Sequence, residues 1–326
     1  MIKDTILNRI VHSSGIEDAS IVRLDVMAVY LLQGLSDAGM FSHMCFKGGN
    51  SLRKIFARRP SRFSRDMDFV DASYQQLSDD GLSAEVYYYK LLETFDQKTM
   101  YDIYWRVKSL SDDEVHGDTL RVDLHFFLYG DRPEEEWERR SDNVLAVECS
   151  FRRPILLPPE SRELREESWF KHLEFKPAAG PVLQVEESAA EKVRAAFQRN
   201  NPRDIYDLYQ YGQLTFNESQ IKTMTVLKCW QDRGMYNGPT NFEPAEFLGK
   251  LQIENYSWEK LKVQVADYAW IEPRELVKGL RERYSFLSEL TEKETELCKD
   301  RWNKKRDLHN ELWDGCKKAF EASKDR

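Results

Sequence analysis

The segment 62–70, RFSRDMDFV, constrains the fold more than any other part of the chain. Apolar and acidic residues alternate at its end, which predicts a strand with one buried face and one polar face. Residues two apart in a strand point to the same side, so Asp66 and Asp68 share the polar face while Met67 and Phe69 enter the core. Neighbouring carboxylates repel each other unless a cation lies between them, and hard divalent ions such as Mg²⁺ or Mn²⁺ prefer carboxylate oxygens.

A third carboxylate lies in the strand-like segment 119–129, TLRVDLHFFLY. Asp123 alternates there with Val122 and Leu124, so its side chain is expected to point away from the core. If this strand neighbours the first one, Asp66, Asp68 and Asp123 converge. Such a triad can hold two metal ions about 3.5–4 Å apart, which activate an attacking oxygen and stabilise a leaving pyrophosphate.

A pair of glycines precedes these aspartates. The sequence Lys47-Gly48-Gly49-Asn50-Ser51 follows the apolar run 43–46 and leads into a helix-like segment that Pro60 is expected to close. Glycines let a backbone approach a phosphate closely, and the N-terminus of a helix offers N–H groups to anions. A Gly-Gly pair more often forms a plain turn. The prediction of a phosphate site therefore rests on the order of strand, glycine pair, helix and aspartate strand, and not on the glycines alone.

The chain divides by pattern into two parts. Helical spacing and strand-like alternation are mixed up to about residue 180, and strand signals fade after about residue 185. We predict an α/β (α+β) domain over 1–180, with a mixed sheet and flanking helices, followed by a helical domain over 181–326. The segments behind this prediction are the helices 21–38, 83–98, 186–199 and 203–212, the helical stretches beyond 243, and the strands 43–46, 66–70, 101–107, 119–129 and 144–151.

Composition excludes several classes of protein. Hydrophobic residues make up 41% of the 326 residues and charged residues 32%, as in folded domains rather than disordered chains. The five cysteines are scattered, which argues against a structural zinc site or a disulfide framework and favours reduced thiols. The chain has no signal-peptide pattern and no run of 18 apolar residues, so we expect a cytoplasmic protein without a membrane span.

A local basic stretch contrasts with the net charge of −8, which argues against wholesale binding of a phosphate backbone. The stretch 53–65 contains no acid and is either a solvated surface or a landing place for phosphates. Its cations are Arg53, Lys54, Arg58, Arg59, Arg62 and Arg65. A second segment, 300–320, carries Trp302, Lys304, Lys305 and Arg306, and is either a helical surface or an RNA contact.

Familiar motifs of other enzymes are missing from the sequence. It has no G-x-x-x-x-G-K-[ST] of P-loop enzymes and no dinucleotide-binding G-x-G-x-x-G. It also lacks the H-E-x-x-H of zinc proteases and the G-x-S-x-G of serine hydrolases.

The order of motifs resembles the AbiEii/AbiGii-type toxin nucleotidyltransferases, which include MenT-like proteins and form a branch of the DNA polymerase β-like superfamily. KGGNSLRKIF followed by RFSRDMDFV is similar to the family pattern K-G-G-T-x-L and R-F-S-x-D-I-D-L, with Asn50 in place of the usual small hydroxyl residue and Ser51 beside it. Glu191-Lys192 and the run 203–208, RDIYDL, match the family's E-K-(L/V) and R-D-x-x-D-L signatures. The motifs cover about residues 20–212.

The resemblance implies a role for each motif. Asp66, Asp68 and Asp123 would bind the metal and act in catalysis, with Lys192 neutralising triphosphate charge. Asp204 and Asp207 lie one helical turn apart, and one of them is expected to orient Lys192 or Arg203. The residues expected to bind or support the nucleotide are Lys47, Gly48, Gly49, Asn50, Ser51, Arg62, Ser64, Arg203, Asp204 and Asp207.

Three functions are compatible with these residues. The first is a toxin that uses Mg²⁺ (or Mn²⁺) to transfer a nucleotide from a nucleoside triphosphate to RNA, with the tRNA 3′ end as one class of acceptor and a cognate antitoxin as partner. The second is the same transfer to a protein side chain or a small molecule. The third is a nucleotide-binding or RNA-binding regulator without turnover.

Overall fold

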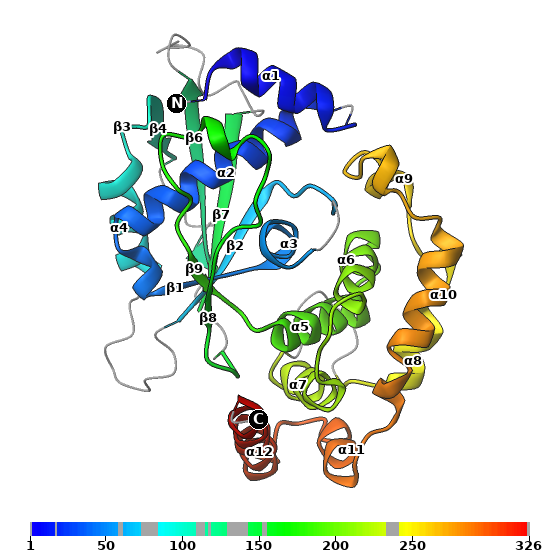
Figure 1. Ribbon diagram of the computed structural model, residues 1–326. Coiled ribbons are helices and arrows are strands. Elements are labelled where there is room, and N and C mark those ends of the chain that lie inside the picture. Colours follow the sequence, from blue (N-terminus) through cyan, green and yellow to red (C-terminus); the bar gives the residue numbers. More distant parts are fainter. Residues whose placement is uncertain are drawn as a thin grey trace. The chain divides into compact units, whose positions relative to one another are not determined.

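The structure is a computed structural model that describes residues 2–16, 18–57, 61–72, 84–108, 115–116, 119–128, 143–151, 155–232 and 241–324 (Figure 1). The chain forms two compact units. The first comprises Met1–Ile155, Pro159–Val182 and Val263–Tyr268; the second comprises Leu156–Pro158, Leu183–Lys262 and Ala269–Arg326.

The first unit is built on one mixed sheet of nine strands within the described residues, in the order β3-β4-β6-β7-β2-β1-β9-β8, with β5 paired to β6. The β2/β7 and β1/β9 pairs are parallel and the others are antiparallel. The strands are β1 Met44–Lys47, β2 Asp66–Asp71, β3 Lys98–Met100, β4 Ile103–Val107, β5 Val115–His116, β6 Thr119–Leu128, β7 Val144–Ser150, β8 Glu160–Arg162 and β9 Gly180–Val182. This mixed sheet confirms the predicted fold class.

Helices of the first unit flank the sheet. They are α1 Asp4–Ser13, α2 Ala19–Asp37, α3 Gly48–Ser51 and α4 Ala84–Phe95, with a π-helical turn over Leu52–Phe56 directly after α3. Met67, Phe69, Val122 and Leu124 are all buried, which confirms the predicted inward face of the two aspartate-bearing strands. All five cysteines lie in the described residues and are free thiols, as expected.

The second unit is helical in its described residues. Its helices are α5 Val185–Gln198, α6 Pro202–Gly212, α7 Glu218–Gln231, α8 Pro244–Lys250, α9 Glu259–Lys262, α10 Pro273–Arg283, α11 Glu292–Cys298 and α12 Arg306–Lys324. Asn201 caps α6 by accepting a hydrogen bond from the backbone N–H of Arg203, and Pro202 occupies the first turn, where its missing N–H costs nothing.

Helix α2 is the central helix of the first unit's core. By length and composition alone it is the one helix of the described residues that could cross a membrane, but 78% of its apolar window is buried inside the structure. Its side chains join the core cluster that also contains Trp105 and Phe126 of the sheet. The apolar character of α2 is therefore accounted for by packing.

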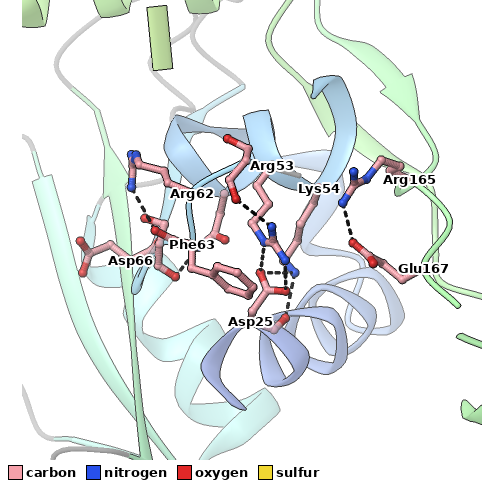
Figure 2. A network of polar contacts seen from close by, with 11 residues as sticks. Asp25, Arg53, Lys54, Arg62, Phe63, Asp66, Arg165 and Glu167 are labelled. Carbon is pink, nitrogen blue, oxygen red and sulfur yellow. Dashed lines mark hydrogen bonds and ion pairs between the residues drawn. The ribbon is translucent and has the colours of Figure 1, made fainter. Parts of the chain in front are cut away.

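One acid interrupts the apolar surface of α2 and organises the basic stretch that follows α3 (Figure 2). Asp25 accepts hydrogen bonds from Arg53 Nε at 2.9 Å and from Lys54 Nζ at 2.9 Å, and all three side chains are buried. Burial alone would raise the pKa of Asp25, but the two cations hold that pKa well below its ordinary value.

The Asp25 cluster extends into the loop that leads to β2. Arg53 donates to the carbonyl oxygen of Ser61 at 3.0 Å, and its guanidinium lies 3.6 Å from the ring centre of Phe63. This cluster fixes α2, the π-helical turn and the approach to β2 relative to one another.

The burial of this cluster corrects the expectation that the stretch 53–65 offers its cations to phosphates. Arg53 and Lys54 are committed to Asp25, and Arg62 is buried as well. Arg65 pairs with Asp18 at 2.6 Å, while Arg58 and Arg59 lie outside the described residues. Arg53 and Lys54 thus form an internal brace with Asp25, because this acid of the distant helix α2 neutralises both cations.

The Asp25→Asn variant tests this brace. It leaves two buried cations without a carboxylate, so we expect the free energy of unfolding at pH 7 to fall by about 3–5 kcal/mol, measured by urea denaturation. Asp18→Asn is the matched control, because asparagine still caps α2 and only the exposed ion pair with Arg65 is removed, at about 0–1 kcal/mol.

The pH dependence gives a second readout of the same brace. Because the folded-state pKa of Asp25 is lowered, its stabilising contribution is present above its ordinary value of 3.8 and is lost as the pH falls through and below that value. The stability gap between wild type and Asp25→Asn should therefore narrow below about pH 4. A gap that is small at pH 7 would contradict the brace.

Candidate active site

The glycine turn and the aspartate strand are in direct contact. Gly48 has φ +78°, and a Cβ at that position would lie 2.0 Å from Oδ2 of Asp68. Only glycine fits there, both because of the left-handed backbone and because the carboxylate occupies the space of a side chain. Lys47, at the end of β1, is the cross-strand partner of Asp68. The turn predicted to meet phosphate thus lies against one of the predicted metal ligands.

A second glycine makes room for Arg62. A Cβ on Gly49 would lie 2.4 Å from a guanidinium nitrogen of Arg62, and that side chain also donates to the carbonyl oxygen of Phe63 at 3.2 Å. Arg62 is 3% exposed. The structure therefore places it behind the turn, where it supports the backbone of Gly49.

Asn50 ties the turn to the start of the aspartate strand. Its Nδ2 donates to the carbonyl oxygen of Asp66 at 2.8 Å and to that of Ser64 at 3.4 Å. Ser51 is buried beside it and donates its hydroxyl to the carbonyl oxygen of Gly48 at 3.0 Å. The Asn50 side chain thereby links the turn to the start of β2.

Asp66 is the open carboxylate of the site. It is partly exposed, and among the described residues its carboxylate makes no hydrogen bond or ion pair. Figure 2 shows its side chain turned away from the Asp25 cluster. A partly exposed carboxylate beside Asp68, with no partner among the described side chains, suits a hard divalent cation.

Strand order corrects one premise about the third carboxylate. The strands of Asp66 and Asp123 are not neighbours, because β7 lies between them. Ala146 of β7 is the cross-strand partner of both aspartates, so the three residues form one row across the sheet and face the same side. Two strand spacings separate the aspartates by roughly 10 Å at the backbone.

The carboxylates are on one face but are not gathered into a cluster. Within the residues that the structure describes, no group of three or more His, Cys, Asp or Glu side chains is placed to hold a metal ion. Ala146, the small residue that lies between Asp66 and Asp123 in this row, is itself buried. The triad stays a prediction that requires the two side chains to turn toward each other.

A second row of charges runs beside the first and was not predicted from the sequence. Lys47, Asp68, Glu148 and Arg121 are successive cross-strand partners on β1, β2, β7 and β6. Arg121 binds Glu148 at 2.5 Å and lies 4.0 Å from Asp123. In this row a cation therefore flanks the acid pair on each side, which lowers the repulsion between the two acids.

The second unit contains its own buried charge cluster on α5 and α6. Lys192 Nζ lies 3.2 Å from Asp204 and 2.9 Å from Asp207, so both carboxylates hold it. Arg199, which was not predicted from the sequence, binds Asp204 at 2.7 Å. Burial opposes ionisation of Asp204, but Lys192 and Arg199 lower its pKa well below the ordinary value. Arg203 instead donates to Asn201 and forms no ion pair within the described residues.

The comparisons with known proteins identify the class as a nucleotidyltransferase. A family model described as the nucleotidyl transferase AbiEii toxin of a type IV toxin–antitoxin system matches residues 30–290. The chain belongs to this AbiEii family, and it is a nucleotidyltransferase toxin. A toxin of such a system has a nucleoside triphosphate as substrate and an antitoxin as partner.

A solved structure shares the fold. MenT4, the nucleotidyltransferase toxin Rv2826c from Mycobacterium tuberculosis H37Rv, matches with a TM-score of 0.78 and 23% identity, covering 97% of this chain and 100% of that one. No curated protein matches the sequence.

Gly48→Ala tests the close approach of Asp68. The added methyl group must displace the carboxylate, so we expect nucleotidyl transfer to fall at least about tenfold, with a loss of folding stability beyond the roughly 1–2 kcal/mol of left-handed strain.

Gly39→Ala is the matched control for Gly48→Ala. Gly39 has a similar φ of +69°, but nothing lies within 4 Å of its Cβ position. This variant should show the strain alone and keep its activity. Equal effects of both substitutions on transfer would contradict a role for the contact between Gly48 and Asp68.

Proposed function

We propose that this toxin transfers a nucleotide from a nucleoside triphosphate to an RNA acceptor, with release of pyrophosphate and with Mg²⁺ (or Mn²⁺) as the metal. The observation that carries the proposal is the contact between Gly48 and the carboxylate of Asp68. Phosphates received at the turn would lie next to the carboxylates that hold the metal.

The metal would be held by Asp66 and Asp68, with Asp123 as the third carboxylate. These donors are carboxylate oxygens, which hard divalent ions prefer, and all three lie on the same face of the sheet. When bound, the metal would supply Lewis-acid stabilisation of the charge that develops on the phosphate oxygens.

The turn residues would receive the triphosphate. The first N–H groups of a helix lack intrahelical partners, and those at the start of α3, at Gly48 and Gly49, would receive the phosphate oxygens. Lys47 would add a positive charge. Asn50, Arg62 and Ser64 would act by keeping the turn against β2, because their contacts are to backbone atoms or lie behind Gly49.

Lys192 would neutralise charge on the triphosphate in the same reaction. Its side chain is 13% exposed and its ammonium is oriented by Asp204 and Asp207, so little conformational entropy is lost when it binds an anion. We propose that Arg203, at the start of α6, makes a supporting contact to the nucleotide.

An RNA hydroxyl is the acceptor that we propose, with the tRNA 3′ end as one class. A terminal ribose hydroxyl is a nucleophile that can attack the α-phosphate of the nucleoside triphosphate directly, with pyrophosphate as the leaving group. Modification of such an end would make the RNA useless in translation, which suits a toxin. We expect the reaction to occur in the cytoplasm.

A labelling assay tests this proposal. Purified protein with Mg²⁺, total cellular RNA and each α-labelled nucleoside triphosphate in turn should place label in RNA. Asp66→Asn and Asp68→Asn should each lower the rate by about a hundredfold or more, because removing a metal ligand forfeits several kcal/mol of transition-state stabilisation. Asp314→Asn, at an exposed position of α12, is the control and should label RNA at the wild-type rate.

The same assay separates the acceptor from the chemistry. Label that appears in protein or a small molecule, and not in RNA, would refute the proposed acceptor while leaving the transferase intact. Undiminished labelling by folded Asp66→Asn protein would refute the proposed site.

Removal of the metal gives an independent prediction. Chelation of divalent ions should abolish labelling, and added Mg²⁺ or Mn²⁺ should restore it, because carboxylates alone cannot neutralise the triphosphate. Ca²⁺, which is larger and accepts irregular coordination, should restore binding better than turnover. Full activity in the chelated protein would contradict a metal-dependent reaction.

A further inference from the structure

The loop between α11 and α12 displays a single aromatic side chain to solvent. Trp302 is 78% exposed, the highest value among the exposed large hydrophobic side chains of the described residues. The others, Val86, Tyr89, Val263 and Tyr268, all belong to the first unit. Tryptophan is highly buried on average in folded proteins, so an indole exposed to this extent is unusual.

The loop holds Trp302 outward through a buried acid. Asp300 is 7% exposed and accepts hydrogen bonds from the backbone N–H of Trp302 at 3.3 Å and that of Lys305 at 2.9 Å. The indole of Trp230 on α7 donates to the same carboxylate at 2.9 Å. Burial raises the pKa of Asp300, but these N–H donors outweigh it and lower the pKa to about 2.

The anchor continues into α12. Trp230 stacks on His309, with ring centres 4.6 Å apart and planes inclined by 26°. Asn303, directly after Trp302, adopts φ +51°, a left-handed conformation that asparagine tolerates better than most residues. The contacts of Asp300 and Trp230 therefore fix the loop in the conformation that exposes Trp302.

Cations flank the exposed indole in the sequence. Residues 299–306, KDRWNKKR, contain one acid, Asp300, which is buried. Arg301, Lys304 and Arg306 are exposed and make no ion pair with any described residue, while Lys305 pairs with Glu296 at 2.6 Å. In a protein of net charge −8, this loop is a local positive field around an aromatic surface.

We infer that this Trp302 loop (residues 299–306) binds single-stranded RNA, with an unpaired base stacked on Trp302 and phosphates on the neighbouring cations. Aromatic rings flanked by Arg and Lys are the usual platform for unpaired bases. A protein partner is less well matched, because protein interfaces bury anchors within a wider apolar patch, and no other large hydrophobic side chain of the described second unit is exposed.

The position of the loop indicates which part of an RNA it would meet. Within the second unit, α7 packs against α5, which carries Lys192, and also against α11 and α12 (Figure 1). The loop therefore lies beyond α7 from Lys192. This inference rests on the proposed RNA acceptor. It adds a second contact between the protein and the RNA, away from the hydroxyl that receives the nucleotide.

Binding of a fluorescein-labelled, unstructured 20-nucleotide RNA to the full chain, measured by fluorescence anisotropy, tests the inference. Trp302→Ala should weaken binding roughly 5- to 150-fold, the range for removal of one stacked base. Trp302→Phe should restore most of the affinity, since it keeps a stacking ring. Binding of duplex RNA of the same length should respond little, because its bases already stack on one another.

The cations have their own readout and control. Lys304→Glu with Arg306→Glu should weaken binding and lower the dependence of log Kd on log salt by about 0.7 for each phosphate that the loop no longer neutralises. Glutamate at Arg306 suits the start of α12, so the helix should persist. Lys98→Glu with Lys318→Glu changes the net charge equally at exposed positions elsewhere and should leave the slope unchanged.

Tyr89→Ala, at another exposed aromatic residue, is the control for Trp302→Ala and should bind the RNA as wild type does. Wild-type affinity in the Trp302→Ala variant would overturn the inference, and the proposed function would stand if RNA were still labelled. Absence of RNA binding by the wild type, with label only in protein, would overturn both.

Discussion

The site depends on one close approach, that of the Asp68 carboxylate to the backbone of Gly48. The contact requires a glycine in a left-handed conformation at the end of β1 and a carboxylate at the matching position of β2. Because β1 and β2 pair in antiparallel register, Lys47 and Asp68 face each other directly beside the turn. The turn proposed to bind phosphate and the strand proposed to bind the metal are thereby joined directly within the sheet.

Buried polar contacts hold this approach in place. Asn50 binds the carbonyl oxygen of Asp66, and Arg62 fills the space beside Gly49. Behind them, Asp25 neutralises Arg53 and Lys54 and so anchors the turn's helix to α2 (Figure 2). Arg53 and Lys54 thus serve the protein's own structure, and the proposed recognition of phosphates at the turn rests on backbone N–H groups and Lys47.

Local patterns were sufficient to predict the main elements, since the inward faces of 66–70 and 119–129 follow directly from period-2 alternation. Long-range pairing could not be predicted in this way. Nothing local shows that β7 separates Asp66 from Asp123, that Asp25 buries the cations of 53–54, or that Arg199 joins Lys192 at Asp204. The spacing of apolar residues shows no clear period in the short strands β8 and β9 or in helix α7, so the sequence did not predict them. The exposure of Trp302 depends on Asp300 accepting from distant Trp230, which sequence spacing does not reveal.

Equilibrium binding of a non-hydrolysable nucleoside triphosphate tests the central claim most directly, because it reports the site without an acceptor. We predict saturable binding to the wild type that requires Mg²⁺ and that is strongly weakened in Asp68→Asn and in Gly48→Ala but retained in Gly39→Ala. Binding of equal strength in all four proteins, or binding indifferent to Mg²⁺, would contradict a nucleotide site built on the contact between Gly48 and Asp68.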